Sequence, residues 1–287
     1  MNWGSGVRMY RSLVKVDAPV PYRLLALDVD GTLLDSRHQL PPRVARAVVA
    51  ACASGLTVTL ATGKLLRSIR SLIEALGLNG PQICLNGAAI MEEVSEPPLH
   101  YAPLTNDDRR AVIETVRRLA PETLISQFAL DDIFVDREHP SLSVFEEFGE
   151  QRPEIVSDLL TVESPPAAKI LVVGSPDRVA ALHEQIAPIL GARLYITTTM
   201  PIFLEFFRFE VNKGHALRRL RQTLGIAQEE VIAIGDGEND APLLREAGLP
   251  VAMSNGATAT RAAAQIIAPS NDEEGVAVVL ERLLRKF

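Results

Sequence analysis

The stretch LLALDVDGT, residues 24–32, decides how the rest of this sequence is interpreted. Its apolar first half predicts a short buried strand, which ends directly in two carboxylates, Asp28 and Asp30. Side chains two positions apart on a strand point to the same face, so both acids start on one side. Active sites of open α/β sheets lie at the carboxyl ends of their strands. The stretch therefore predicts a chemical site, and the alternative is a solvated Asp-Gly turn.

Outward from this strand, strand and helix patterns alternate from residue 22, which predicts βαβ units and a mainly parallel sheet. Between residues 104 and 204 the pattern changes to several strands with fewer helices, as in an α+β domain. We therefore expect a discontinuous α/β core, residues 21–103 and 205–287, with a cap domain, residues 104–204, inserted into it. Residues 1–20 are expected to be a weakly ordered extension.

The expected elements follow from hydrophobic periodicity and from helix-start and helix-end residues. The expected core strands are 23–28, 56–61, 82–85, 231–234, 249–252 and 265–267, with 89–94 returning as a hairpin. The expected cap strands are 123–129, 132–136, 169–173, 194–199 and 202–207. The expected helices are one that starts at Pro41-Pro42 and ends at Gly55, then 64–76, 105–119 (capped by Thr105), 176–190 (capped by Ser175), 214–224, 240–247, 257–264 and one from about 272.

Composition narrows the functional classes. Of the 287 residues, 47% are hydrophobic and 23% are charged, as in soluble globular proteins. A net charge of −7 and only 5% aromatic residues argue against a nucleic-acid partner. The two cysteines, Cys52 and Cys84, lie in apolar segments and form no ligand pattern with the five histidines. With no membrane-length apolar run, the expectation is a cytoplasmic protein, a monomer or a small homo-oligomer.

A second polar signal follows the strand 56–61. The segment Thr62-Gly63-Lys64 offers a hydroxyl and backbone amides at the expected start of a helix, which is an arrangement suited to an anion. The alternative is a plain helix cap.

A third signal is Lys213, at the start of the helix that follows Val211-Asn212. Cations are unfavourable at helix N-termini, so a lysine there is accounted for if its ammonium faces a bound anion. The alternative is a solvated surface lysine.

A fourth signal, GDGEND at residues 235–240, places Asp236 and Asp240 after another strand. A calcium loop of the EF-hand type is rejected, because it needs Gly at position 241 and Glu at 247, where this chain has alanine.

Together these motifs resemble the haloacid dehalogenase (HAD) superfamily, and within it the Cof-like phosphatases with a large inserted cap (type IIB). The resemblance covers the chain after residue 21 and rests on motifs that occur in the family's order. They are DVDGTLL (28–34), ATGK (61–64), NGAAI (86–90), VNKGHAL (211–217), GDGENDAPLL (235–244) and SNDEEGVA (270–277). It implies a Rossmann-like core with an α+β cap and a phosphatase acting on a small phosphorylated metabolite.

The resemblance also implies residue roles. Asp28 is the expected nucleophile, and Asp30 the expected acid and base. Asp28 and Asp236 are expected to hold Mg²⁺ by their side chains and Asp30 by its backbone carbonyl, while Asp240 anchors Asp236 or a metal-bound water. The residues expected to bind the phosphoryl oxygens are Thr62, Gly63, Lys213 and Asn239.

Elementary chemistry agrees with this reading. Crowded carboxylates need a divalent cation to stay ionised, and oxygen-only ligands favour Mg²⁺ over zinc. Mg²⁺ and Lys213 would supply the charge neutralisation on which phosphoryl transfer depends. The chain departs from the family at Lys64, where Arg is usual and where Lys lacks the bidentate fork. Residues 253–257 also depart from the usual order and are left out of the expected site.

Two other functions remain open from the sequence. A phosphomutase or phosphotransferase would form the same aspartyl-phosphate but pass the phosphoryl group to a sugar hydroxyl rather than to water. A non-catalytic binding protein on the same scaffold is the alternative from another class, although it would be expected to have lost the nucleophile or the lysine. The substrate and the cap residues that select it are not readable from the sequence.

Overall fold

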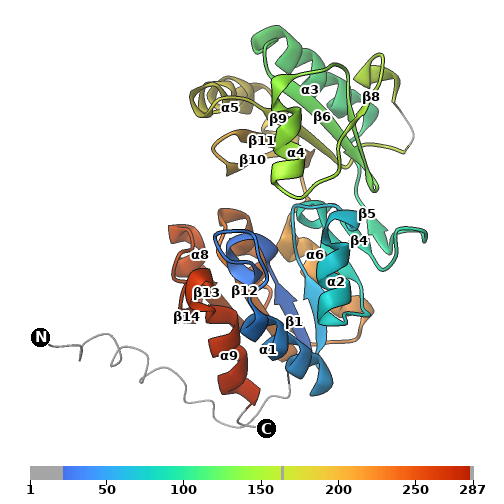
Figure 1. Ribbon diagram of the computed structural model, residues 1–287. Coiled ribbons are helices and arrows are strands. Elements are labelled where there is room, and N and C mark those ends of the chain that lie inside the picture. The colour runs from blue at the N-terminus through green and yellow to red at the C-terminus, as the bar shows by residue number, and fades with distance from the viewer. Residues whose placement is uncertain (1–21, 163–164, 285–287) are drawn as a thin grey trace, which may run out of the picture.

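The structure, a computed structural model, describes residues 22–162 and 165–284, and the expected extension 1–20 lies outside them. Two domains lie one above the other, joined by two chain crossings (Figure 1). The lower domain is built on a parallel sheet and the upper one on a mostly antiparallel sheet. The prediction of an α/β core with an inserted α+β domain is confirmed.

The core sheet is parallel throughout and has the order β14-β13-β12-β1-β2. Its strands are β1 (Leu24–Leu27), β2 (Thr57–Leu60), β12 (Val231–Gly235), β13 (Leu249–Met253) and β14 (Ile266–Ala268). A small antiparallel sheet, β3 (Gln82–Cys84), β4 (Ala89–Met91) and β5 (His100–Tyr101), contains the predicted hairpin.

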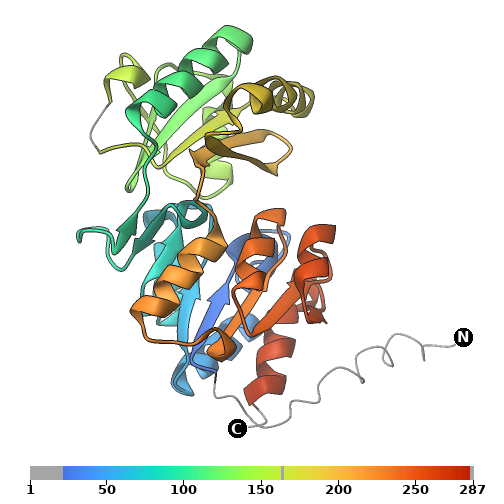
Figure 2. The ribbon, with the colours of Figure 1, turned by 180° about the vertical axis from the view of Figure 1, so that it is seen from behind.

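Helices cover both faces of the core sheet (Figures 1 and 2). Leu25 and Leu27 of β1 pack on the side of α1 (Pro42–Ala53) and α9 (Gly275–Leu284). Leu24 and Ala26 point to the opposite side, where α6 (Lys213–Thr223) and α7 (Ala241–Arg245) lie. Because β1 is buried on both faces, its four residues are all apolar, and the first polar side chain follows where the strand ends. The remaining core helices are α2 (Arg70–Leu76) and α8 (Thr258–Ala263).

The cap is a sheet with the order β10-β11-β9-β6-β7-β8. Its elements are α3 (Asn106–Leu119), β6 (Leu124–Ala129), β7 (Asp132–Val135), α4 (Ser143–Glu147), β8 (Glu154–Ile155), β9 (Lys169–Val173), α5 (Pro176–Leu190), β10 (Leu194–Met200) and β11 (Phe203–Arg208). Ile125 packs with α3 and α5, whereas Phe128 lies on the opposite face, with α4. This second face is turned toward the core (Figure 1).

Three local expectations need correction. The helix expected from residue 64 begins later, with a 3₁₀ turn at Arg67–Ile69, so Thr62-Gly63-Lys64 is a loop and not a helix N-terminus. Ser175 precedes α5, but its side chain makes no capping hydrogen bond, whereas the Thr105 cap on α3 is confirmed. The boundary expected after residue 204 falls inside β11, because residues 203–206 remain paired with β9 in the cap sheet.

Candidate active site

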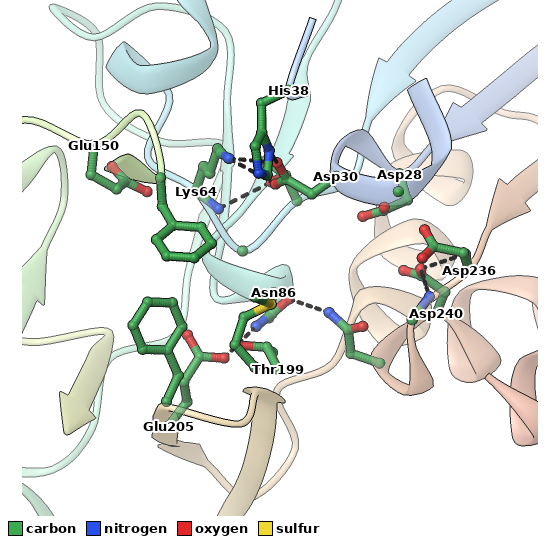
Figure 3. Close-up of a pocket in the computed structure, with 18 of the residues that line it drawn as sticks. Asp28, Asp30, His38, Lys64, Asn86, Glu150, Thr199, Glu205, Asp236 and Asp240 are labelled. Atoms are coloured by element: carbon green, nitrogen blue, oxygen red, sulfur yellow. Dashed lines mark hydrogen bonds and ion pairs between the residues drawn. The ribbon is translucent and has the colours of Figure 1, made fainter. Parts of the chain in front are cut away.

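The strand-end signals converge on one cavity of about 370 Å³ between core and cap (Figure 3). Every residue singled out from the sequence lines it: Asp28, Asp30, Thr62, Gly63, Lys213, Asp236, Asn239 and Asp240. Parallel strands bring their carboxyl ends to the same edge of a sheet, which explains why segments 200 residues apart in sequence meet here. The chemical role of each residue remains a prediction.

Lys213 is buried against two carboxylates. Its Nζ donates to Oδ1 of Asp28 at 2.5 Å and to Oδ1 of Asp240 at 2.6 Å. Burial by itself would lower the pKa of Lys213, but Asp240 and Asp28 outweigh it and raise the pKa above the ordinary value. The cation at this helix start is therefore balanced by acids of the site, and it is not a solvated surface lysine.

Asp240 has both carboxylate oxygens occupied. While Oδ1 accepts from Lys213, Oδ2 accepts from the backbone amides of Asp236 at 3.0 Å and Gly237 at 2.8 Å. The side chain is fully buried. These contacts match an anchor for the loop that carries Asp236, which is one of the two roles expected for Asp240.

Asp28 and Asp236 form the electronegative part of the site. Thr32 donates from Oγ1 to Oδ1 of Asp236 at 2.6 Å. Burial, and then the neighbouring Asp240, raise the pKa of Asp28 well above its ordinary range against the opposing effect of Lys213. Burial is also the main cause that raises the pKa of Asp236 to about 6. Ionising both acids is costly without a further cation.

The donor set fits a hard divalent cation. Oxygens of Asp28, Asp236 and Asp240 lie within 4.8 Å of one another, and the group consists of aspartates alone. Mg²⁺ prefers hard oxygen ligands of this kind. The raised pKa of Asp236 indicates that its negative charge is unfavourable here without a cation, and a bound Mg²⁺ would offset that charge.

Asp30 is turned away from this cluster, as Figure 3 shows. Both of its oxygens accept from Nζ of Lys64 at 2.8 Å, and Nδ1 of His38 lies 3.4 Å from Oδ1. Lys64, whose role the sequence left open, is therefore the ion-pair partner of the expected acid and base. A single ammonium reaches both oxygens, although it cannot form the guanidinium fork.

Gly31 makes the close approach of the two loops possible. Its φ of +81° lies in the region that favours glycine, and a Cβ there would lie 2.4 Å from Oδ2 of Asp236. On the other side of the loop, Asn255 donates to the Gly31 carbonyl at 2.9 Å. Residues 253–257, left out of the expected site, thus support the loop without lining the cavity.

Among the cavity residues that were not assigned a role from the sequence are Asn86, Lys169 and Glu205. Asn86 accepts from Nδ2 of Asn239 at 2.9 Å and donates to Oε2 of Glu205 at 3.2 Å, which links core to cap. Lys169 donates to Oε1 of Glu205 and to the Gly63 carbonyl, both at 3.1 Å. Asn86 carries the same strand-end signal as the other loops. Lys169 and Glu205 have no such signal in the sequence, because they lie within cap strands and reach the cavity only through the way those strands pair.

No helix in the described ranges, 22–162 and 165–284, is long and apolar enough to cross a membrane.

Comparison with known proteins gives a consistent result. The family model of haloacid dehalogenase-like hydrolases matches residues 25–280. The HMP-PP phosphatase of Enterobacter sp. is 30% identical over 235 residues, covering 81% of this chain and 84% of its own. The 5-amino-6-(5-phospho-D-ribitylamino)uracil phosphatase of Bacillus subtilis is 27% identical over 273 residues, covering 90% and 94%. A haloacid dehalogenase-like hydrolase structure from Bacteroides thetaiotaomicron superposes with a TM-score of 0.82 at 28% identity, covering 91% of this chain and 99% of its own.

Proposed function

Because the chain belongs to the haloacid dehalogenase-like hydrolases, we propose that it is a Mg²⁺-dependent phosphatase of a small phosphorylated metabolite. The observation that carries the proposal is the Asp28 carboxylate, which lies at the end of β1 beside Lys213, with Asp236 in the same group. Relatives named as phosphatases of small molecules support it. The proposed reaction converts a phosphate monoester and water into an alcohol and inorganic phosphate.

In the first step, Asp28 attacks phosphorus, and the bond to the leaving-group oxygen breaks as an aspartyl-phosphate forms. For this step the Asp30 side chain leaves Lys64, turns toward Asp28 in its protonated form and donates its proton to that oxygen. Asp30 lies on the cavity wall, and its ion pair with Lys64 limits where its carboxyl can point. In the second step Asp30 takes a proton from water, which attacks phosphorus, releases inorganic phosphate and restores Asp28.

The other residues position and neutralise the phosphoryl group. Lys213 offers a buried positive charge next to Asp28, where the charge of the transferring group develops. Thr62, Gly63 and Asn239 line the same cavity and are assigned to the phosphoryl oxygens. Asp28, the Asp30 carbonyl and Asp236 would hold Mg²⁺, which would supply charge neutralisation for the transferring group. The hydrogen bond from Lys169 to the Gly63 carbonyl joins the cap to the core beside the site.

The test is release of inorganic phosphate from an aryl phosphate by the full chain, with and without Mg²⁺. We expect turnover only with Mg²⁺, and none in the Asp28→Asn variant. Equal turnover in EDTA, or an active Asp28→Asn variant, contradicts the mechanism. Phosphate release that requires an added sugar acceptor would instead indicate a phosphotransferase.

A further inference from the structure

The lining of the cavity is divided chemically between the two domains. The core contributes only polar residues and glycines, all near Asp28 and the loops around it. Every apolar side chain of the lining comes from the cap: Phe128, Val144, Phe145, Phe148, Leu171, Met200 and Phe203. A phosphate ester bound with its phosphoryl group at Asp28 therefore extends its leaving group toward the cap's apolar wall.

Aromatic rings form most of that wall. The ring centroids of Phe148 and Phe203 are 5.2 Å apart in an edge-to-face arrangement, and those of Phe128 and Phe145 are 6.2 Å apart. Phe148 also meets the imidazole of His38 edge-on at 6.0 Å. Such rings favour an apolar or aromatic partner over a hydrated one. Met200 is 39% exposed, so it has apolar surface free for a ligand.

The polar cap residues in the lining are largely occupied. Lys169 is bonded to Glu205 and to the Gly63 carbonyl, and its ammonium lies 3.9 Å from the centre of the Phe128 ring. The second oxygen of Glu205 accepts from Asn86. Glu150 accepts a hydrogen bond from the hydroxyl of Ser68 in the core. Thr199 adds one more hydroxyl to the cap side of the lining. Few hydrogen-bonding groups therefore remain there to replace the water that a polyhydroxylated leaving group would lose.

We propose that the leaving group selected by this cap is a single, planar and mainly apolar ring, as in a phosphorylated aromatic heterocycle, rather than a sugar. The inference rests on the proposed function and adds the substrate class. A volume of about 370 Å³ is near the lower end for small-molecule pockets, which fits a phosphate with one ring. The rings of Phe148 and Phe203 bind the leaving group, and sugar hydroxyls facing them would be left without partners.

The test compares pyridoxine 5′-phosphate, which has an aromatic ring and no aldehyde to react with lysines, with ribose 5-phosphate. We expect a kcat/KM at least about tenfold higher for the ring substrate, because unpaired hydroxyls discriminate strongly between ligands. Phe148→Ala and Phe203→Ala should each lower that ratio severalfold. Phe134→Ala is the matched control, since Phe134 and Phe203 are both 9% exposed but Phe134 packs on the opposite face of the cap sheet.

The inference is overturned if the wild type has nearly the same kcat/KM for the two substrates. It is also overturned if Phe148→Ala and Phe203→Ala both leave the ratio of the two kcat/KM values as it is in Phe134→Ala. Affinity is measured separately, by calorimetry of the Asp28→Asn variant with each phosphate in the presence of Mg²⁺. Equal affinity for the two compounds also overturns the substrate class, whatever the turnover. Tighter binding of the ring phosphate without any wild-type turnover would support the substrate class and contradict the proposed function, so the two failures are distinguishable.

Discussion

Nζ of Lys213 lies 2.5 Å from Oδ1 of Asp28, although 185 positions separate the two residues. Lys213 is 1% exposed and bonds Asp240 as well, so one ammonium offsets two buried carboxylates. The pair joins the first strand of the core to the helix that follows the cap. It therefore assembles the site only when the two halves of the discontinuous core fold together.

Lys213→Gln should both destabilise the protein and abolish turnover. Removing the cation leaves Asp28 and Asp240 buried without their partner, which typically costs about 3–5 kcal/mol in the free energy of unfolding. Denaturant unfolding measures this loss, and phosphate release measures activity. Arg46→Gln, an exposed change on α1, is the control and should alter neither. A Lys213→Gln variant as stable as this control would contradict the role of the buried pair.

Lys64→Met should lower kcat more than it raises KM. Lys64 contacts both oxygens of Asp30, so its loss disturbs the expected acid and base without removing a phosphate ligand. We expect a decrease in kcat of about tenfold to a hundredfold, at the lower end of acid–base contributions. Lys64→Arg retains a cation and should recover most of the rate. A change confined to KM, with no rescue by arginine, would place Lys64 at the substrate instead.

Gly31→Ala should impair folding and activity far more than Gly55→Ala. Both glycines have positive φ values, +81° and +98°, so both substitutions carry backbone strain, of order 1 kcal/mol or more. Only at Gly31 would the new Cβ meet another group, Oδ2 of Asp236 at 2.4 Å; at Gly55 nothing lies within 4 Å. Comparing thermal unfolding and phosphate release in the two variants separates the effect of backbone strain from the effect of the steric clash with Asp236. Equal losses in both would show that the close approach to Asp236 is unimportant.

Adding Mg²⁺ should stabilise the wild type and not Asp236→Asn. A ligand at a hundred times its Kd adds about 2.7 kcal/mol to the free energy of unfolding, and chelation should remove that gain. Since the pKa of Asp236 is raised to about 6 without metal, protons compete with the ion, and the gain should be larger at pH 8 than at pH 5. Asp177→Asn, an exposed change in the cap, is the control. An undiminished Mg²⁺ effect in Asp236→Asn would contradict the assignment.

Glu150→Gln should change how stability depends on pH. Burial raises the pKa of Glu150 above its ordinary 4.5, against the lowering effects of Lys169 and Ser68. A raised pKa in the folded state means that the contribution to stability is complete below pH 4.5 and is lost as pH rises through the folded value. The wild type should therefore lose stability relative to Glu150→Gln between pH 4.5 and pH 8 in denaturant titrations.

Glu147→Gln, an exposed change in the same segment, serves as the control for that comparison and should follow the wild type at both pH values. A wild type that gains stability relative to Glu150→Gln as pH rises would show that the electrostatic attraction of Lys169 exceeds the effect of burial.

The sequence by itself determined the alternation of elements and the site at the strand ends. Both rest on local physics: apolar strands buried on two faces stop at polar residues, and parallel strands stop at one edge. Asp28 and Asp236 could therefore be assigned to one site from the sequence, whereas Lys213 was assigned from its unfavourable position at a helix start and from the family resemblance. The late start of the helix after Lys64 was missed, because a Thr-Gly-Lys segment also resembles a helix cap.

Only the tertiary structure decided which groups face one another across the cavity. The partner of Asp30 is Lys64, both oxygens of Asp240 are occupied, and Asn86 links Asn239 to the cap. The five-residue helix α4 was not predicted from the sequence, yet it brings Phe145 to the cavity. These features depend on the register of cap strands and on the docking of cap to core. Such contacts join residues far apart in the chain, so no local pattern encodes them, and the character of the leaving-group site is visible only in three dimensions.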